Sequence, residues 1–190
     1  MTGIEIDATL QIVPDLVMIL RAESDRGCVL LASALLEDEL EKHLLRRLLP
    51  PARKTDELFA RESRGPISGF SDKINLAYRV GVITKAERSI YHQLRELRNA
   101  CAHHISTQTF AESHFRDRTT NIIEESLELW EFLRIAMSRQ MNAESAPSTV
   151  KEFVNLLTWR YSFEFFFALV VADKRVQLER VHQFPPANAA

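Results

Sequence analysis

Glycine, cysteine and alternating β-type patterns are scarce in this chain, and each scarcity excludes a class of protein. The 190 residues include five glycines and two cysteines, which excludes collagen-like and disulfide-rich scaffolds. β-Branched residues never alternate with polar ones over a strand length, whereas Leu, Ala, Glu, Arg and Lys dominate. The sequence therefore predicts an all-α fold, a single-domain bundle of about six to seven helices over residues 1–182, followed by a frayed tail over 183–190.

Paired cysteines and targeting segments are missing as well. Cys28 and Cys101 have no CxxC spacing and lie inside predicted helices, so we interpret them as small buried hydrophobic residues of a reducing compartment. The first residues, Met1 to Asp7, carry two carboxylates and no basic region of the secretory type. These features predict a cytoplasmic protein.

Strong net charge and long apolar runs are also absent. The formal charge of −2 provides no overall attraction to nucleic-acid phosphates. The most apolar run, residues 161–172, is interrupted by Glu164 and falls short of the roughly 20 residues of a spanning helix. We therefore expect no membrane association.

Motifs for cofactors and metals are not found in the sequence. There is no Gly-rich phosphate loop, no HExxH and no Ser-His-Asp pattern, so we expect no cofactor and no metal. Four histidines have spacings that suit no zinc site, and we predict that they are surface imidazoles: His43, His92, His114 and His182.

Helical periodicity and capping residues predict the helices. Pro50-Pro51 ends the second helix, and Gly81 supplies a left-handed residue after the third, for which Ser71 is the expected N-cap. The acidic run 37–39 is interpreted as a solvated face. The capping boxes Thr84–Glu87 and Thr149–Glu152 begin two later helices. The predicted ranges are 9–21, 25–49, 72–80, 84–103, 116–141 and 149–181.

The last helix is apolar nearly all round between Phe163 and Val171. Such a helix is covered on every side. It therefore either crosses the domain core or forms an oligomer interface, and the sequence leaves both open.

One helix ends in a concentration of polar side chains, Arg98-Asn99-Ala100-Cys101-Ala102-His103-His104. Ile90, Leu94, Leu97 and Cys101 form its core stripe, and the nearly opposite stripe contains His92, Glu96, Asn99 and His103. At 100° per residue, Arg98 lies about 140° from His103. Asn99 and His103 therefore share a face, and a single chain does not bring Arg98 onto it.

The spacing Arg98-x4-His103, with an amide after the arginine, resembles the R-x4-6-H motif of HEPN domains. That resemblance implies a dimerising helical bundle with metal-independent RNA cleavage: His103 as general acid/base, Arg98 stabilising the phosphorane charge and Asn99 orienting the site. A dimer would let Arg98 of one chain serve His103 of the other. Alternatively, Arg98 pairs with an acidic residue of a neighbouring helix and His103-His104 cap the helix end.

A longer stretch, residues 65–83 with Leu94 to His103, resembles the core of the mannitol-operon repressor (MtlR-like) family, and residues 25–28 and 32–40 fit the same pattern. The resemblance covers about residues 20–135. It implies an all-helical, repressor-type transcription regulator without its own DNA-binding module, which forms a homodimer and acts through a protein partner. We expect the binding residues to be Lys85, Arg88, Arg95, Glu96 and His104. The alternative to a regulator is an endoribonuclease that binds RNA.

Direct sequence-specific DNA binding is a third interpretation. Residues 72–80, a short turn and the helix from Thr84 form an outline like a helix-turn-helix. A recognition helix needs groove-reading residues at its start, and only Lys85 and Arg88 are basic there. We therefore expect no such binding. Six basic residues are interpreted as scattered solvated charges, with a patch near Arg98 that serves RNA as the alternative: Arg61, Arg64, Arg79, Lys85, Arg88 and Arg95.

Overall fold

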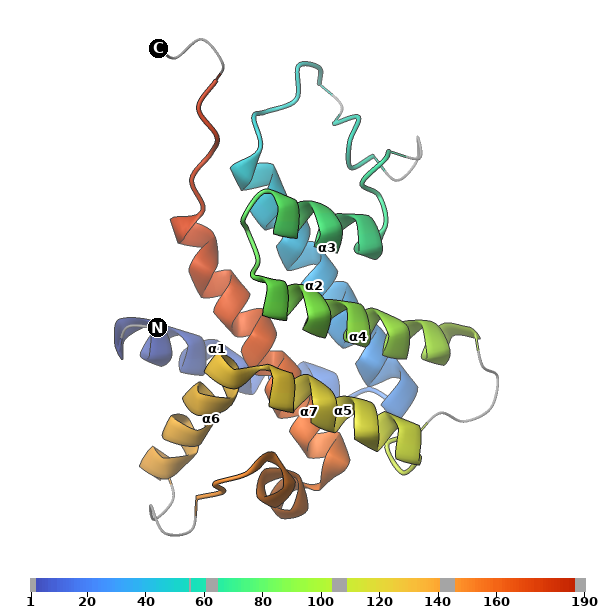
Figure 1. Ribbon diagram of the computed structural model, residues 1–190, viewed down its shortest axis with the longest axis vertical. Coiled ribbons are helices and arrows are strands. Elements are labelled where there is room, and N and C mark those ends of the chain that lie inside the picture. Colours follow the sequence, from blue (N-terminus) through green and yellow to red (C-terminus); the bar gives the residue numbers. More distant parts are fainter. Residues whose placement is uncertain (1–2, 55, 61–64, 104–108, 141–145, 187–190) are drawn as a thin grey trace.

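The computed structural model describes residues 3–54, 56–60, 65–103, 109–140 and 146–186. Over these residues the chain is entirely helical, without a strand, as predicted (Figure 1). The elements are α1 (Gly3–Arg21), α2 (Asp25–Arg47), α3 (Phe70–Arg79), α4 (Lys85–His103), α5 (Ser113–Glu125), α6 (Leu127–Gln140), α7 (Val150–Gln177) and the 3₁₀ turn η2 (Leu178–Arg180).

Helix α7 occupies the centre of the bundle. It packs against α1, α2 and α5, while α2 also contacts α3 and α4. Phe163, Phe166 and Phe167 are fully buried, and the rings of Phe163 and Phe167 lie 4.5 Å apart. Of the two roles that the sequence left open, the structure shows that the Phe-rich helix crosses the core.

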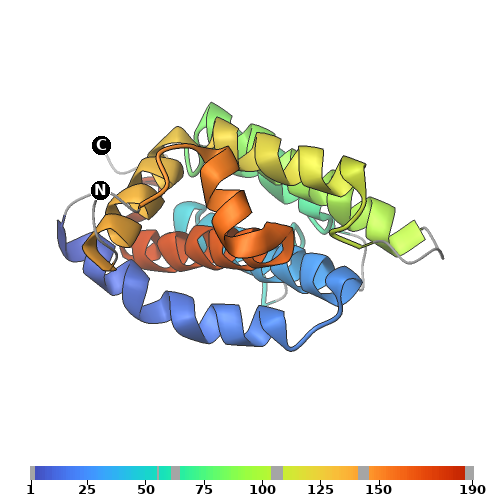
Figure 2. The ribbon, with the colours of Figure 1, turned by 90° about the horizontal axis from the view of Figure 1, so that it is seen from below.

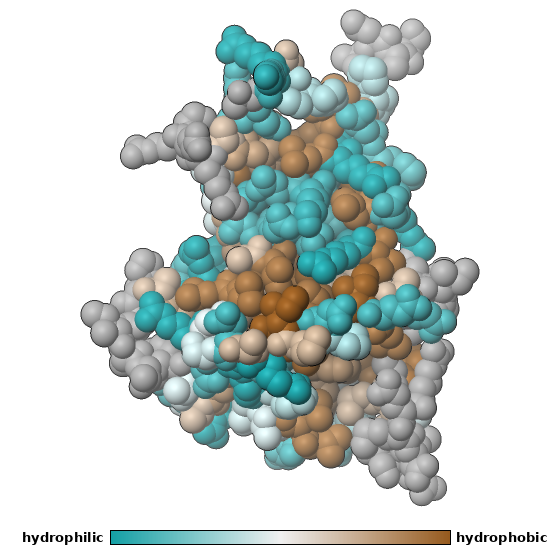
Figure 3. All heavy atoms as spheres, turned by 180° about the vertical axis from the view of Figure 1, so that it is seen from behind, coloured by the Kyte–Doolittle hydropathy of each residue, from teal (hydrophilic) through white to brown (hydrophobic). Residues whose placement is uncertain are grey.

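Helix α1 covers α7 along one edge of the molecule (Figure 2). Its inner side chains Val13, Leu16 and Leu20 are buried, whereas Met18 is 67% exposed and Ile19 is 48% exposed. The face opposite to that of Figure 1 carries hydrophobic residues across its middle, between hydrophilic regions (Figure 3). α1 therefore shields the core and leaves apolar side chains in contact with solvent.

The predicted continuous helix over 149–181 is interrupted. Thr158 has φ 70° and ψ 158°, which no helix tolerates, so the segment before it runs at an angle to the rest of α7 (Figure 2). The predicted capping box at its start is confirmed, because Thr149 and Glu152 exchange both hydrogen bonds. Propensity and capping predicted where the helix begins but not where it bends.

The predicted helix over 116–141 is also wrong as one element, since Ser126 divides it into α5 and α6. Ser126 Oγ donates a hydrogen bond to the Ile122 carbonyl at 2.6 Å, and its own carbonyl accepts the first bond of α6 from Trp130 N. A serine side chain that competes for backbone groups in this way favours a helix boundary.

Local features around α2, α3 and α4 are partly as predicted. Gly81 has φ +71°, and the Thr84–Glu87 capping box is present. α3 begins earlier than expected, with Gly69 rather than Ser71 as the N-cap. The acidic run 37–39 is not a solvated face, because Glu39 is 1% exposed and pairs with Lys42 and Arg175.

The chain after η2 is anchored where a frayed tail was predicted. Phe184 N donates to the Arg47 carbonyl at 2.9 Å, and the Arg47 guanidinium lies 3.9 Å from the centre of the Phe184 ring. Gln183 Nε2 donates to the Leu48 carbonyl. The segment that directly follows η2 is therefore held against the end of α2.

Within the described residues, one helical segment, Val150–Arg180, is long and apolar enough to cross a membrane. More than half of its most apolar window, 56%, is buried within the protein. Burial of this kind is typical of a helix in a protein core, so length and composition are weak evidence for a membrane span.

Candidate functional site

Helix α4 carries the residues that the sequence singled out. Its core stripe, Ile90, Leu94, Leu97 and Cys101, is buried, with at most 2% exposure for any member. Because this stripe fixes the rotation of the helix against the bundle, it also fixes the direction in which the polar side chains point.

The polar side chains of α4 fall on two faces. At about 100° per residue, an arc about 80° wide holds one set of them. We call this set the α4 basic face: Lys85, Arg88, His92, Arg95 and Asn99. The other face turns to α5, where Glu96 pairs with Arg118, and Ser89 and Gln93 donate to Glu125 at 2.9 and 2.7 Å. The carboxylate of Glu96 is thus engaged away from the basic face.

Asn75 of α3 organises the middle of this face. Its Oδ1 accepts hydrogen bonds from Arg88 Nε at 3.2 Å and Nη2 at 2.9 Å, and it lies 3.2 Å from His92 Nε2. A guanidinium only donates, so the oxygen is the acceptor for both neighbours and His92 Nε2 carries a hydrogen. Arg88 and His92 are therefore held in place by a neutral amide.

The charge of the face comes from Lys85 and the two arginines rather than from its imidazole. Burial lowers the pKa of His92, and the nearby Arg88 and Arg95 lower it further, against the opposing effect of Glu96. His92 Nδ1, an acceptor in this tautomer, is buried without a hydrogen bond among the described residues, and so is the donor Arg95 Nε. The face thus offers fixed positive charge, and the two polar atoms without a partner are buried beneath it.

The Arg98-x4-His103 motif is only partly described. Arg98 is exposed and its Nη1 donates to Asn99 Oδ1 at 3.2 Å. Within the described residues we find no acidic partner for Arg98, contrary to the structural alternative above. His103 closes α4, but its side chain and the whole of His104 lie outside the described residues. Arg26 Nη2 donates to the Ala102 carbonyl at 3.4 Å and so caps the helix end.

The other predicted binding residues differ in their exposure and in the contacts they make. Lys85 is exposed at the start of α4, whereas Arg88 is half-buried against Asn75 and the Tyr78 ring. Arg79 is exposed, and Arg61 and Arg64 lie outside the described residues. Sequence reasoning missed Asn75, because only the packing of α3 on α4 brings it to the face.

The prediction that all four remaining histidines are surface imidazoles is wrong for His43. His114 and His182 are exposed and His92 is half-buried, but His43 is 1% exposed. His43 follows Leu40 by three residues and Leu36 by seven, the spacing of one helix face, which could have signalled that it shares the apolar stripe of α2.

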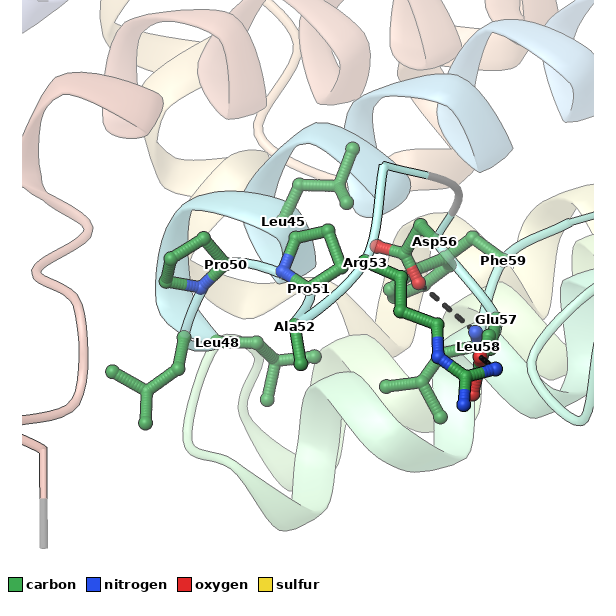
Figure 4. Close-up of a pocket in the computed structure, with 11 residues that line it drawn as sticks. Leu45, Leu48, Pro50, Pro51, Ala52, Arg53, Asp56, Glu57, Leu58 and Phe59 are labelled. Carbon is green, nitrogen blue, oxygen red and sulfur yellow. Dashed lines mark hydrogen bonds and ion pairs between the residues drawn. The ribbon is translucent and has the colours of Figure 1, made fainter.

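A concave surface lies at the C-terminal end of α2. It encloses about 480 Å³ and is lined by mostly apolar residues, among them Leu45, Leu48, Pro51, Leu58 and Phe59 (Figure 4). Arg53 and Glu57 form an ion pair of 2.8 Å at its polar side. No described contact specifies an occupant, and we assign it no ligand.

Among the described residues, no group of three or more His, Cys, Asp or Glu side chains could hold a metal ion. Comparison of the chain with family models, with curated proteins and with solved structures found no match.

Proposed function

We propose that this chain is a cytoplasmic, repressor-type transcription regulator of the MtlR-like kind, a homodimer that acts by binding a protein partner rather than by contacting DNA itself. The observation that carries the proposal is the α4 basic face. Lys85, Arg88 and Arg95 lie together there, and the carboxylates of the same helix are engaged elsewhere, Glu96 with Arg118 and Glu87 with Lys174. A face of this kind suits an acidic protein surface.

The same geometry argues against direct reading of DNA. A recognition helix presents free side chains at its N-terminal end. Here Arg88 is bound to Asn75 through two hydrogen bonds, which leaves Lys85 as the free cation at the start of α4 among the described residues. Together with the net charge of −2, this supports a role that does not need DNA contact.

The test is complementation in cells of the source organism that lack the gene. We expect their transcript profile to change, and wild type to restore it. The double variant Lys85→Gln/Arg95→Gln should fail, whereas Lys54→Gln/Lys151→Gln, which removes two exposed lysines elsewhere, should restore it at the same protein level.

A photo-crosslinker at the exposed Ala86 identifies the partner, and we expect acidic peptides from a transcription-associated protein. An unchanged transcript profile in the deletion strain would refute the regulatory role. Full restoration by the Lys85/Arg95 variant would refute the α4 basic face as the docking surface.

A metal-independent endoribonuclease is the second candidate, and the state of Arg98 favours it. The guanidinium is exposed, contacts the neutral Asn99 and has no acidic partner among the described residues, so it is available to a phosphate. In this candidate His103 serves as general acid/base, and the partner chain's Arg98 completes the site in a dimer.

This candidate predicts RNA cleavage in EDTA that His103→Ala abolishes and Arg134→Ala, a change on α6, does not. Mixed dimers of Arg98→Ala and His103→Ala chains should regain activity, because one of their two sites would combine an intact Arg98 with an intact His103. An inert wild type over a broad RNA panel would eliminate it.

A further inference from the structure

Thr158 divides α7 into two helical segments, residues 150–157 and 159–177, which lie at an angle to each other (Figure 2). Among the described residues, φ is positive at two positions, Gly81 and Thr158. Glycine adopts such values at no steric cost, but a β-branched residue at φ 70° and ψ 158° is strained. The bend of α7 therefore carries backbone strain that a straight helix would not.

The local sequence of α7 is that of a continuous helix. Residues 150–177 contain no glycine and no proline, the two residue types that most strongly disfavour a helix interior. The capping box of Thr149 and Glu152 satisfies the first turn, and helical structure is present on both sides of Thr158. If Thr158 alone took helical dihedral angles, α7 would be one straight helix of 28 residues.

The two segments of α7 contact different parts of the protein. In the first segment, the ring of Phe153 packs against Trp130 of α6, with the ring centres 5.6 Å apart. In the second segment, the ring of Phe163 lies 5.0 Å from that of Phe110, which precedes α5. A straight α7 could not keep both sets of contacts within one chain. It could keep both if its second segment lay in the core of a second copy, whose own second segment had left.

Large hydrophobic side chains are accessible to solvent on both sides of this hinge. Leu156 is 49% exposed, Tyr161 is 38% exposed and Trp159 is half-buried. If two copies exchanged their second segments, the two hinges would lie beside each other at the twofold axis, and these side chains would cover one another. The exchanged dimer would therefore bury apolar surface that a single chain leaves in contact with water.

We propose that two copies of this chain exchange the second segment of α7 by straightening at Thr158, so that residues 159–180 of each copy fill the core of the other. Phe163 then packs on the partner subunit's Phe110, and Arg160 pairs with the partner subunit's Asp25, so the contacts of the core are kept. Strain is relieved at two hinges in each dimer. The inference rests on the homodimer of the proposed function and specifies which segment joins the copies.

Refolding of mixed chains tests the exchange. A ¹³C-labelled and an unlabelled sample of the full chain are unfolded in urea, mixed and refolded at high protein concentration, and the dimer is isolated by size-exclusion chromatography with light scattering. In isotope-filtered NOE spectra of the mixed dimer, we expect intermolecular contacts between the rings of Phe110 and Phe163. Both rings are buried, at 4% and 0% exposure, so copies that associate only through their surfaces give no such contacts.

The variant Thr158→Gly should shift the equilibrium toward the monomer, because glycine adopts the bent conformation without strain and weakens the straight helix. Since each dimer contains two hinges, we expect its Kd to rise roughly tenfold or more. Asn155→Ala, at an exposed position of the first segment, raises helix propensity in both forms and should leave the Kd unchanged. Sedimentation equilibrium of samples refolded over a range of concentrations measures the Kd.

A dimer without the contacts between Phe110 and Phe163 would overturn the exchange and leave the homodimer of the proposed function in place. An unchanged Kd in Thr158→Gly would also overturn the proposal, because strain at Thr158 would not be what the dimer relieves. A chain that stays monomeric at every concentration would overturn both the exchange and the homodimer, while the transcript profile still tests the regulatory role on its own.

Discussion

Thr158 occupies a backbone conformation that β-branched residues avoid. Its φ of 70° with ψ 158° falls in a region that is essentially restricted to glycine. The side chain is exposed, while Ser162 Oγ donates to the Thr158 carbonyl at 2.7 Å and so supports the bend. The strain is therefore in the backbone, and the side chain contributes little to offset it.

We predict that Thr158→Gly stabilises the protein by about 1 kcal/mol, since relief of backbone strain exceeds the entropic cost of glycine. Thr158→Val, which keeps the β-branch, should not stabilise it. Urea denaturation of both variants against wild type measures the effect. A loss of stability in the glycine variant as large as that expected in a regular helix would contradict the conformation described for Thr158.

At the scale of elements, Arg160 joins α7 to the corner between α1 and α2. Its guanidinium pairs with Asp25 at 2.8 Å and with Glu164, and it donates to the carbonyls of Leu20 at 3.0 Å and Glu23 at 2.8 Å. These carbonyls lie at the end of α1, so one side chain caps that helix and neutralises the buried Glu164.

We predict that Arg160→Ala lowers the free energy of unfolding by about 3 kcal/mol, because a buried carboxylate loses its closest partner. Arg160→Lys should recover only part of this, since an ammonium cannot make the same set of contacts. Thermal and urea unfolding measure the changes. Arg134→Ala, which breaks an exposed pair with Glu131, is the control and should leave stability unchanged; equal losses for both variants would contradict the role of Arg160.

At the scale of the whole molecule, ionisable groups from three helices meet in the interior. Glu39 and His43 of α2, Glu87 of α4, and Asp173 and Lys174 of α7 lie where these helices pack together. The pKa of His43 is lowered by burial and that of His92 by burial and its arginine neighbours. Folding is therefore linked to the protonation of both imidazoles.

We predict that stability falls as the pH decreases below about 6.5, the ordinary pKa of an unfolded histidine. Below this pH the unfolded chain binds protons that the folded chain does not, so protonation favours unfolding. Urea denaturation at pH 7, 6 and 5 measures the slope, which should be smaller in the double variant His43→Gln/His92→Gln. An identical slope in wild type and variant would show that neither imidazole is held neutral.

Sequence patterns predicted which helix carries the candidate site and which of its faces is polar. They did not predict which residues its polar side chains contact. The apolar stripe of α4 correctly placed Asn99 away from the core. Arg98, which helical geometry set apart from the face of Asn99, nevertheless reaches it, because its long side chain donates to Asn99 Oδ1. Two interactions depend on residues in other helices. Glu96 forms its ion pair with Arg118 of α5, and Arg88 and His92 are hydrogen-bonded to Asn75 of α3. Periodicity reports which face of a helix is apolar and carries no information on which polar partner lies opposite.

The all-helical class, the capping boxes, the left-handed Gly81 and the core stripe of α4 were determined by local sequence alone, because each depends on residues within about two turns of one another. The burial of Glu39 and His43 and the anchoring of Phe184 on α2 were decided by the tertiary structure. They result from packing between segments far apart in the chain, where burial and long-range hydrogen bonds outweigh local propensity. The breaks at Ser126 and Thr158 also became visible only in the structure, where a serine hydroxyl bonds a backbone carbonyl one turn away at each of them.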